Sequence, residues 1–320
     1  MRCVRRSAAA ASLSSAALLA LGDGTAMPVL GFGTYQIAAH EVQAPVLSAL
    51  RAGYRHIDTA EGYGNECGVG EAVSDACRQG LLTREDLYIT TKLWPGNPQW
   101  GQQVKSFDKA IQRCQKSLRK LDLGKVDLYL IHGPFSGGPQ SRLTQWEALL
   151  ECQHRGYTTS IGVSNYGISH LLEIEQAGLP LPAANQLEIH PFCQKLDILA
   201  YMTEKDIAPI AYSSLAPLSN WREGGESAKS QEQRTQPSPF RLMAEKRGWS
   251  EAQILLRWAL DKGYAIIPKS THEDRIVQNA DLFSAGALSD EEIAAIANMD
   301  KNEAVAFGSP GEPFDPVTAL

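Results

Sequence analysis

The sequence has no apolar run long enough to cross a membrane and no excess of positive charge. A helix that spans a bilayer needs about 20 predominantly apolar residues, and no stretch of this chain approaches that length. Its 30 lysines and arginines stand against 36 acidic residues, which gives a net charge of −6. Such a chain has no global field that would hold a polyanion. We therefore expect neither a membrane nor a nucleic acid among its partners.

Cysteine patterns typical of metal sites are also missing. The 6 cysteines of the 320-residue chain are scattered singly, without a C-x-x-C pair and without a histidine spacing that suggests a zinc site. We therefore predict no metal. An even number of cysteines would permit disulfides, but free thiols are favoured in a chain this long. We accordingly expect a reducing compartment, the cytoplasm.

The N-terminus leaves a second compartment open. Residues 1–20 are rich in Ala and Ser, contain three arginines and lack acidic residues, a composition that resembles a presequence for the mitochondrion or another organelle. Gly22-Asp23-Gly24 lies between two short apolar segments and indicates a β-hairpin. Cleavage after Ala20 would remove the first strand of that hairpin. We therefore treat residues 1–17 as a tail or a presequence and residues 18–320 as one domain.

From about residue 25 the sequence alternates between short apolar runs and helical periodicity. Eight runs read as buried parallel strands: Val29–Gly33, His56–Ala60, Leu87–Leu93, Val126–His132, Ser160–Ser164, Ala184–Ile189, Ile207–Tyr212 and Ala265–Lys269. Several of the helical stretches between them end at a glycine, as helices commonly do. These glycines are Gly53, Gly80, Gly156 and Gly263.

Eight strand–helix units predict a closed (β/α)8 barrel, the TIM barrel. The alternative is a doubly wound open sheet, which would have a G-x-G-x-x-G motif after its first strand. The nearest candidate, GFGTYQ, lacks the third glycine. The sequence therefore favours the barrel, an α/β fold.

Two segments break the alternation. Residues 219–238 are polar and rich in Gly, Ser and Gln, and they are either a solvated loop or a lid over a bound ligand. The last fifteen residues are irregular and rich in proline. We expect that tail to be non-helical and to cross the mouth of the barrel.

Polar residues interrupt the apolar strands repeatedly at the same end. In a barrel, the carboxyl ends of the strands carry the chemistry. Burying so many polar groups costs free energy unless they are paired, so stability alone does not explain the pattern. The residues, in strand order, are Asp58 and Tyr63, Lys92, His132, Ser164 and Asn165, Asn185, Gln186 and His190, Tyr212, and Lys269, Ser270 and Thr271.

Four of these residues predict carbonyl reduction if they meet. A Lys92 ammonium beside the Tyr63 hydroxyl would lower the pKa of that phenol, and Asp58 would keep the lysine charged. His132 could donate to a carbonyl oxygen. The result is a general acid aimed at an oxygen that becomes an alkoxide, which requires a hydride donor.

A site for that donor can also be read from the sequence. Tyr212 offers an aromatic face for a nicotinamide ring, and amide and hydroxyl side chains follow the fifth and sixth strands. Lys269 and Arg275 lie six positions apart, where the eighth strand ends and the next helix begins. Two cations near a helix N-terminus suggest a site for a 2′-phosphate, and hence NADPH.

At these residues the sequence strongly resembles the aldo-keto reductase family. The resemblance runs from about residue 22 to residue 300. The strings that carry it are DGTAMPVLGFGTY, GYRHIDTAEGYGNE, TTKLW, VDLYLIH, SIGVSNY, NQLEIHP and IPKS, the last followed by RI and QN. The resemblance implies a (β/α)8 barrel closed at its bottom by an N-terminal hairpin. It also implies an NADPH-dependent reductase of the alcohol dehydrogenase (NADP+) type.

The resemblance further implies roles for individual residues. The catalytic tetrad falls on Asp58, Tyr63, Lys92 and His132, with Tyr63 as proton donor. The implied cofactor contacts are Gly33, Thr34, Tyr35, Asp58, Ser164, Asn165, Gln186, Tyr212, Ser213, Leu215, Lys269, Ser270, Thr271, Arg275, Gln278 and Asn279. Gln278 replaces a commonly acidic adenine contact, a change from which we expect little loss.

The substrate is less well specified. Trp94 matches a pocket position of the family, and with Tyr35 and His132 it would line the substrate site. Gly133 stands where many members carry an aromatic or another larger residue, which predicts a wider pocket. Trp221 could add to the wall from the suspected lid. We expect a small or medium aldehyde or ketone as substrate and a monomeric enzyme.

Two other functions remain open at this point. The chain could be a regulatory protein, since potassium-channel β subunits resemble the same family. It could also be a lyase or isomerase that uses Lys92 as a Schiff-base nucleophile.

Overall fold

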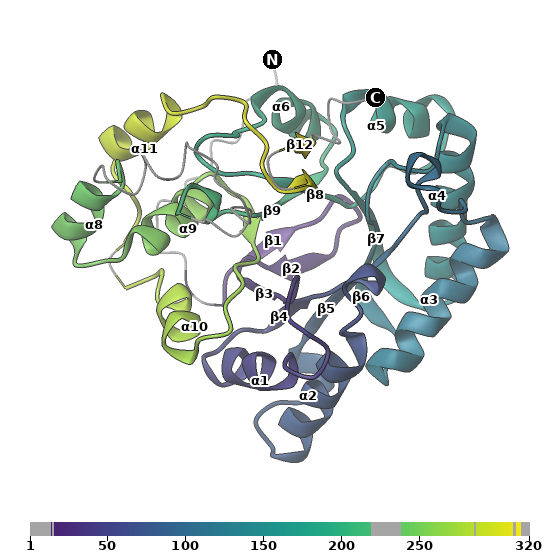
Figure 1. Ribbon diagram of the computed structural model, residues 1–320, viewed down its shortest axis with the longest axis horizontal. Coiled ribbons are helices and arrows are strands. Elements are labelled where there is room, and N and C mark those ends of the chain that lie inside the picture. Colours follow the sequence, from purple (N-terminus) through teal and green to yellow (C-terminus); the bar gives the residue numbers. More distant parts are fainter. Residues whose placement is uncertain (1–13, 15, 219–237, 285, 310–311, 315–320) are drawn as a thin grey trace.

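A barrel of parallel strands forms the centre of the protein (Figure 1). The computed structural model describes residues 14, 16–218, 238–284, 286–309 and 312–314, the last six of these without their side chains. The barrel strands are β3 (Gly31–Gly33), β4 (His56–Asp58), β5 (Tyr88–Leu93), β6 (Val126–Ile131), β7 (Thr158–Ser164), β8 (Ala184–Glu188), β9 (Ala208–Tyr212) and β10 (Ala265–Ile266). Each lies within a run predicted from the sequence or extends it by two residues.

The strands follow one another around the barrel in chain order. Each pairs in parallel with the next, from β3 to β10. A parallel bridge between Leu30 and Ile266 joins the last strand to the first, and the Gly33 amide donates to the Pro268 carbonyl at 3.0 Å. These contacts close the ring. The predicted (β/α)8 barrel is confirmed, and every strand therefore presents its carboxyl end at the same mouth.

Helices surround the barrel (Figure 1). They are α1 (Gln43–Arg51), α2 (Glu66–Arg78), α3 (Phe107–Leu121), α4 (Pro139–His154), α5 (Ile168–Gln176), α6 (Leu196–Glu204), α8 (Arg241–Arg247), α9 (Glu251–Asp261), α10 (Glu273–Ala280) and α11 (Asp290–Ala297). The four glycines predicted to end helices all have positive φ, between 68° and 96°. Residues other than glycine rarely adopt that backbone conformation.

A β-hairpin closes the amino end of the barrel, as predicted. Its strands are β1 (Leu18–Ala20) and β2 (Ala26–Pro28), paired antiparallel. The Gly22 amide donates to the Ala183 carbonyl just before β8 at 3.2 Å, and the Thr25 hydroxyl contacts that of Ser160 on β7 at 2.9 Å. Met27 is fully buried and packs inside the barrel with residues of the inner core. This apolar plug fills the amino end of the barrel, opposite the strand ends that carry the polar residues.

Some sequence expectations fall outside the described residues. They concern the tail or presequence over most of residues 1–17, and the loop or lid with Trp221. The C-terminal tail is described in part: β11 (Phe307–Ser309) and β12 (Glu312–Phe314) pair antiparallel. This tail was predicted to be non-helical, and its described residues form strands. Among the described residues, none of the helices combines the length and apolar character that a membrane crossing requires.

Candidate active site

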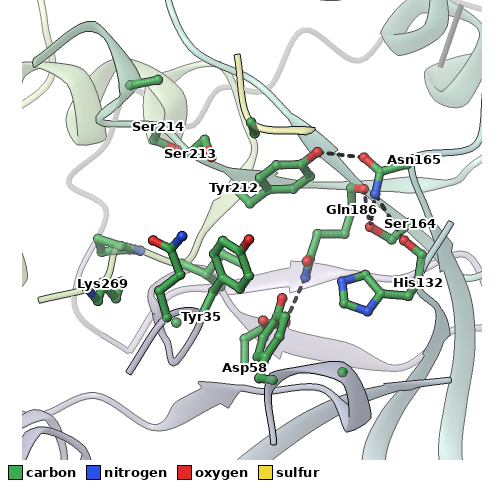
Figure 2. Close-up of a pocket in the computed structure, with 18 of the residues that line it drawn as sticks. Tyr35, Asp58, His132, Ser164, Asn165, Gln186, Tyr212, Ser213, Ser214 and Lys269 are labelled. Carbon is green, nitrogen blue, oxygen red and sulfur yellow. Dashed lines mark hydrogen bonds between the residues drawn. The ribbon is translucent and has the colours of Figure 1, made fainter. Parts of the chain in front are cut away.

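A cavity opens at the carboxyl ends of the strands (Figure 2). Its volume is about 1380 Å³, more than the roughly 300–1,000 Å³ of a pocket for one drug-sized ligand. Tyr63, His132, Lys269 and Arg275 all line it, and His132 and Lys269 lie on opposite sides of it (Figure 2). One cavity therefore joins the predicted catalytic residues to the predicted phosphate-binding cations and has room for a dinucleotide beside a small substrate.

Lys92 is the centre of the predicted catalytic cluster. It lies on β5 and is fully buried. Its Nζ donates to Asp58 Oδ1 at 2.5 Å, to the Thr59 carbonyl at 3.0 Å and to the Tyr63 hydroxyl at 3.1 Å. The three donors of an ammonium are thereby used. This arrangement argues against the Schiff-base alternative, because a nucleophilic amine needs a free lone pair.

Asp58 completes the ion pair from the end of β4. Its Oδ1 accepts from Lys92, and its Oδ2 accepts from the Gln186 side-chain amide at 2.7 Å (Figure 2). Its side chain is 2% exposed. A carboxylate held from two strands in this way keeps a buried ammonium charged and fixes its position under the Tyr63 oxygen.

Local structure after β4 brings Tyr63 over the lysine. Residues Glu61–Tyr63 form a single 3₁₀ turn, and the fully buried Asn65 holds the segment that follows. The Asn65 amide donates to the carbonyls of Thr34 and Ile37 at 2.8 and 2.9 Å. The short connection between Asp58 and Tyr63 is therefore fixed against the connection after β3.

The expected pKa of Tyr63 was wrong in sign. We expected Lys92 to lower it, whereas burial, followed by the negative charge of Asp58, raises the pKa of Tyr63 well above its ordinary value of 10. The reason is that a buried phenolate loses its hydration, and Asp58 offsets the charge of the lysine. The phenol consequently keeps its proton at neutral pH, as a proton donor must.

His132 supplies a neutral imidazole to the same cavity. Burial, followed by the nearby Lys92 charge, lowers the pKa of His132 well below its ordinary value of 6.5. The ring lies edge-to-face against Tyr63 and Trp94, with centroid distances of 5.4 Å to each. An uncharged ring at this position can donate one hydrogen bond to a carbonyl oxygen without competing for the proton of Tyr63.

The amide and hydroxyl side chains of the cofactor side bond largely to one another. Asn165, in the left-handed region with φ 62°, donates to the His132 carbonyl at 3.0 Å and accepts from the Tyr212 hydroxyl at 2.6 Å (Figure 2). The Ser164 hydroxyl donates to the Gln186 carbonyl at 2.9 Å. These bonds join β7, β8 and β9 and hold the Tyr212 ring at the edge of the cavity.

Most of the predicted cofactor contacts line this cavity. They are Gly33, Tyr35, Asp58, Ser164, Asn165, Gln186, Tyr212, Ser213, Leu215, Lys269, Ser270, Arg275, Gln278 and Asn279. Two predicted contacts do not line it. The Thr34 side chain is buried and donates to the Asp58 carbonyl at 3.0 Å, and Thr271 is exposed outside the lining. The residues that do line the cavity fit a phosphorylated dinucleotide, with cations at one end and an aromatic ring at the other.

The substrate side carries more aromatic surface than the sequence indicated. Trp94 stacks on Trp100 at a centroid distance of 6.0 Å, and Phe135 lies 5.6 Å from Trp94. A Cβ on Gly133 would come within 2.3 Å of the Phe135 ring. The space beside Gly133 is therefore filled by a neighbouring aromatic side chain, and the wider pocket stays a prediction.

Sequence reasoning missed Trp100, Phe135 and the ion pair of Glu61 with Arg113. Trp100 lies in the loop after β5 and is 50% exposed. Glu61 accepts from the Trp94 amide at 3.4 Å and forms an ion pair with Arg113 on α3. For Trp100 a signal was available in the sequence, because it is a large aromatic residue in a Pro/Gly-rich loop at the carboxyl end of a strand.

Comparison with known proteins identifies the family. The model of the Aldo/keto reductase family matches residues 29–301. The aldo-keto reductase AKR2E4 of Bombyx mori is 35% identical over 298 residues, which cover 89% of this chain and 92% of that protein. Methylglyoxal reductase DkgA of Escherichia coli is 35% identical, covering 91% and 96%. D-galacturonate reductase of Fragaria ananassa is 36% identical, covering 95% and 97%.

A solved structure is similar over the same extent. The crystal structure of Bombyx mori AKR2E4 in complex with NADP superposes with a TM-score of 0.78 at 34% identity, covering 91% of this chain and 95% of that one. The match spans the barrel and the strand ends that carry the cluster of Asp58, Tyr63, Lys92 and His132. The chain therefore belongs to the aldo/keto reductase family, oxidoreductases of aldehydes and ketones that use NADPH.

Proposed function

We propose that this protein reduces small or medium aldehydes and ketones to alcohols, as a reductase of the alcohol dehydrogenase (NADP+) type that is reversible toward alcohol oxidation. One observation carries the proposal. Lys92 Nζ donates to both Asp58 and Tyr63 in a cavity that reaches Lys269 and Arg275. A regulatory protein without catalysis would have no need of a buried ion pair beneath a phenol, which disfavours that alternative.

Each member of the cluster has one task. NADPH supplies a hydride to the carbonyl carbon when it is bound. The Tyr63 hydroxyl gives its proton to the carbonyl oxygen, and Lys92 stabilises the phenolate that remains. His132 donates to the same oxygen and orients the carbonyl. Asp58 keeps Lys92 charged and in place, and acts through that lysine.

The cofactor is held at both ends of the cavity. Lys269 and Arg275 bind the 2′-phosphate, Arg275 from the first turns of α10. Tyr212 supports the nicotinamide ring. The remaining lining residues named above contact the dinucleotide between these points, and Thr34 contributes only by fixing the backbone beside Asp58. The cation pair favours NADPH over NADH.

An apolar substrate fits the aromatic side of the cavity. Tyr35 and Trp94 flank Tyr63 and His132, so a carbonyl group bound by the two catalytic side chains has its substituent against aromatic rings. Burial against such rings stabilises apolar groups by about 25 cal/mol per Å². We propose that aromatic or apolar aldehydes are preferred.

The enzyme acts as a monomer, without a nucleic-acid partner, in the cytoplasm. The five described cysteines are free thiols, which supports a reducing compartment. The N-terminus keeps an organelle as the alternative. Sedimentation of the purified protein tests whether it is a monomer. N-terminal sequencing of the mature protein tests whether a presequence for an organelle is removed.

A panel of carbonyl compounds tests the reaction. Aliphatic and aromatic aldehydes and ketones are incubated with enzyme and NADPH, and the loss of reduced-cofactor absorbance is followed, then repeated with NADH. We expect turnover without any partner protein and a clear preference for NADPH. Absence of turnover with every carbonyl, together with a stoichiometric protein partner on purification, would instead establish the regulatory alternative.

A further inference from the structure

The C-terminal segment that reaches the cavity, residues 296–306, is held by the connection between β8 and α6. The Phe192 carbonyl accepts from the amides of Lys301 and Glu303, both at 3.1 Å. The buried Gln194 side chain donates to the carbonyls of Ile296 and Ala297 at 3.0 and 3.3 Å. These bonds bring the segment from α11 back toward the mouth of the barrel.

Glu188 holds the end of this segment where it meets the cavity. Its Oε1 accepts from the Val305 amide at 2.7 Å and its Oε2 from the Ala306 amide at 3.0 Å. His190 Nε2 contacts the same Oε1 at 3.0 Å. Glu188 is 3% exposed, so water does not compete for these bonds. Since Ala306 lines the cavity, the carboxylate fixes part of the cavity wall.

The position of Glu188 relates this contact to the catalytic cluster. Glu188 and Gln186 are two residues apart on β8, and alternate residues of a strand point to the same side. Gln186 donates to Asp58, whereas Glu188 accepts from the C-terminal segment. One face of β8 therefore supports both the ion pair and that segment.

We propose that Glu188 is a positioning residue that sets the substrate side of the cavity by holding residues 305–306 in place. Glu188 is not among the residues that line the described cavity, and it acts on the cavity through the segment. This inference rests on the proposed function, because its consequence is measured with a carbonyl substrate. The expected signature is a higher KM for the carbonyl compound with little change in the KM for NADPH.

The test compares Glu188→Gln with a matched control, Glu66→Gln. Glu66 is fully buried and accepts from Thr91 at 2.8 Å and from Lys120 at 3.2 Å, but it contacts no part of residues 296–306. Both variants remove one carboxylate charge from a hydrogen-bonded, buried site. Only Glu188→Gln replaces a carboxylate oxygen that accepts from the Val305 or Ala306 backbone by an NH2 group, which can only donate.

Two readouts are measured on the full-length enzyme. Hydrogen exchange reports the amides of Val305 and Ala306, and steady-state kinetics give separate KM values for a benzaldehyde substrate and for NADPH. In Glu188→Gln we expect exchange of the two amides and the aldehyde KM each to rise about tenfold, the effect of losing a charged hydrogen bond. Glu188→Asp, which keeps the charge, restores part of both.

The outcomes separate this inference from the proposed function. Unchanged exchange at residues 305–306 in Glu188→Gln, or an equal rise of both KM values in Glu188→Gln and Glu66→Gln, overturns the positioning role. If the wild type reduces no carbonyl compound, the proposed function fails and the substrate consequence fails with it. The exchange measurement still decides whether Glu188 holds the segment.

Discussion

Lys92 Nζ lies 2.5 Å from Asp58 Oδ1, with both side chains almost completely buried. Removing two charges from water is costly, and a buried ion pair is seldom the most stable choice for a barrel interior. The pair is explained by its third partner. An ammonium fixed between Asp58 and the Tyr63 oxygen meets the negative charge that develops when the phenol gives up its proton.

The first prediction concerns the proton donor. Tyr63→Phe removes the hydroxyl and leaves the ring that packs against His132 and Tyr35. General acid catalysis contributes about 10²–10⁴-fold, so kcat for aldehyde reduction should fall by that factor while NADPH affinity, measured by fluorescence titration, stays within about twofold. Retention of wild-type kcat would remove Tyr63 from its role.

Because the pKa of Tyr63 is raised, wild-type reduction should not decline between pH 6 and pH 8 through loss of this proton.

The second prediction concerns the buried ion pair. Lys92→Met leaves Asp58 charged without its ammonium, and breaking a buried pair costs about 3–5 kcal/mol. Denaturant unfolding should show that loss. The double variant Lys92→Met with Asp58→Asn removes both charges and should regain much of the stability, yet remain inactive. A double variant that is no more stable than Lys92→Met would contradict this account.

The third prediction concerns stability in acid. Burial lowers the pKa of His56 and of His170 from 6.5 to about 4. Between these values the unfolded chain binds more protons than the folded chain, so the free energy of unfolding should be highest above pH 6.5 and fall as the pH drops toward 4. Each histidine contributes on the order of 2–3 kcal/mol to this loss.

His170→Asn is the matched variant for that measurement. The Gly167 amide donates to His170 Nδ1 at 3.0 Å, and an asparagine oxygen can accept the same bond without titrating. Unfolding in urea from pH 4 to pH 7 should show a shallower pH dependence for this variant. An unchanged slope would show that His170 is not among the groups responsible.

The fourth prediction concerns the aromatic wall. Trp100→Ala removes the ring stacked on Trp94, and aromatic pairs are worth about 0.5–1.5 kcal/mol beyond burial. The KM for aromatic aldehydes should rise about two- to tenfold, whereas that for a short aliphatic aldehyde, which has no ring to pack against Trp100, should stay unchanged. Trp100→Phe should preserve most of the affinity. An equal effect on both substrates would assign Trp100 to loop stability instead.

The sequence alone determined the fold and the family. Strand positions were predictable because a parallel strand buried on both faces is a short apolar run, and helix ends were predictable because glycine accepts positive φ. The order of polar residues at the strand ends placed Asp58, Tyr63, Lys92 and His132 at one mouth, since parallel strands share one direction. These signals are local, and a single chain displays them without reference to its neighbours.

Only the tertiary structure decided how these residues act. The direction of the Tyr63 pKa shift depends on burial, which no spacing reveals. The Thr34 side chain points into the wall instead of the cavity, and Phe135 fills the space beside Gly133. Glu188 accepts hydrogen bonds from backbone amides 117 and 118 positions away. Each of these facts arises from packing between segments distant in the chain, where the cost of desolvation and the available partners are set by the whole fold.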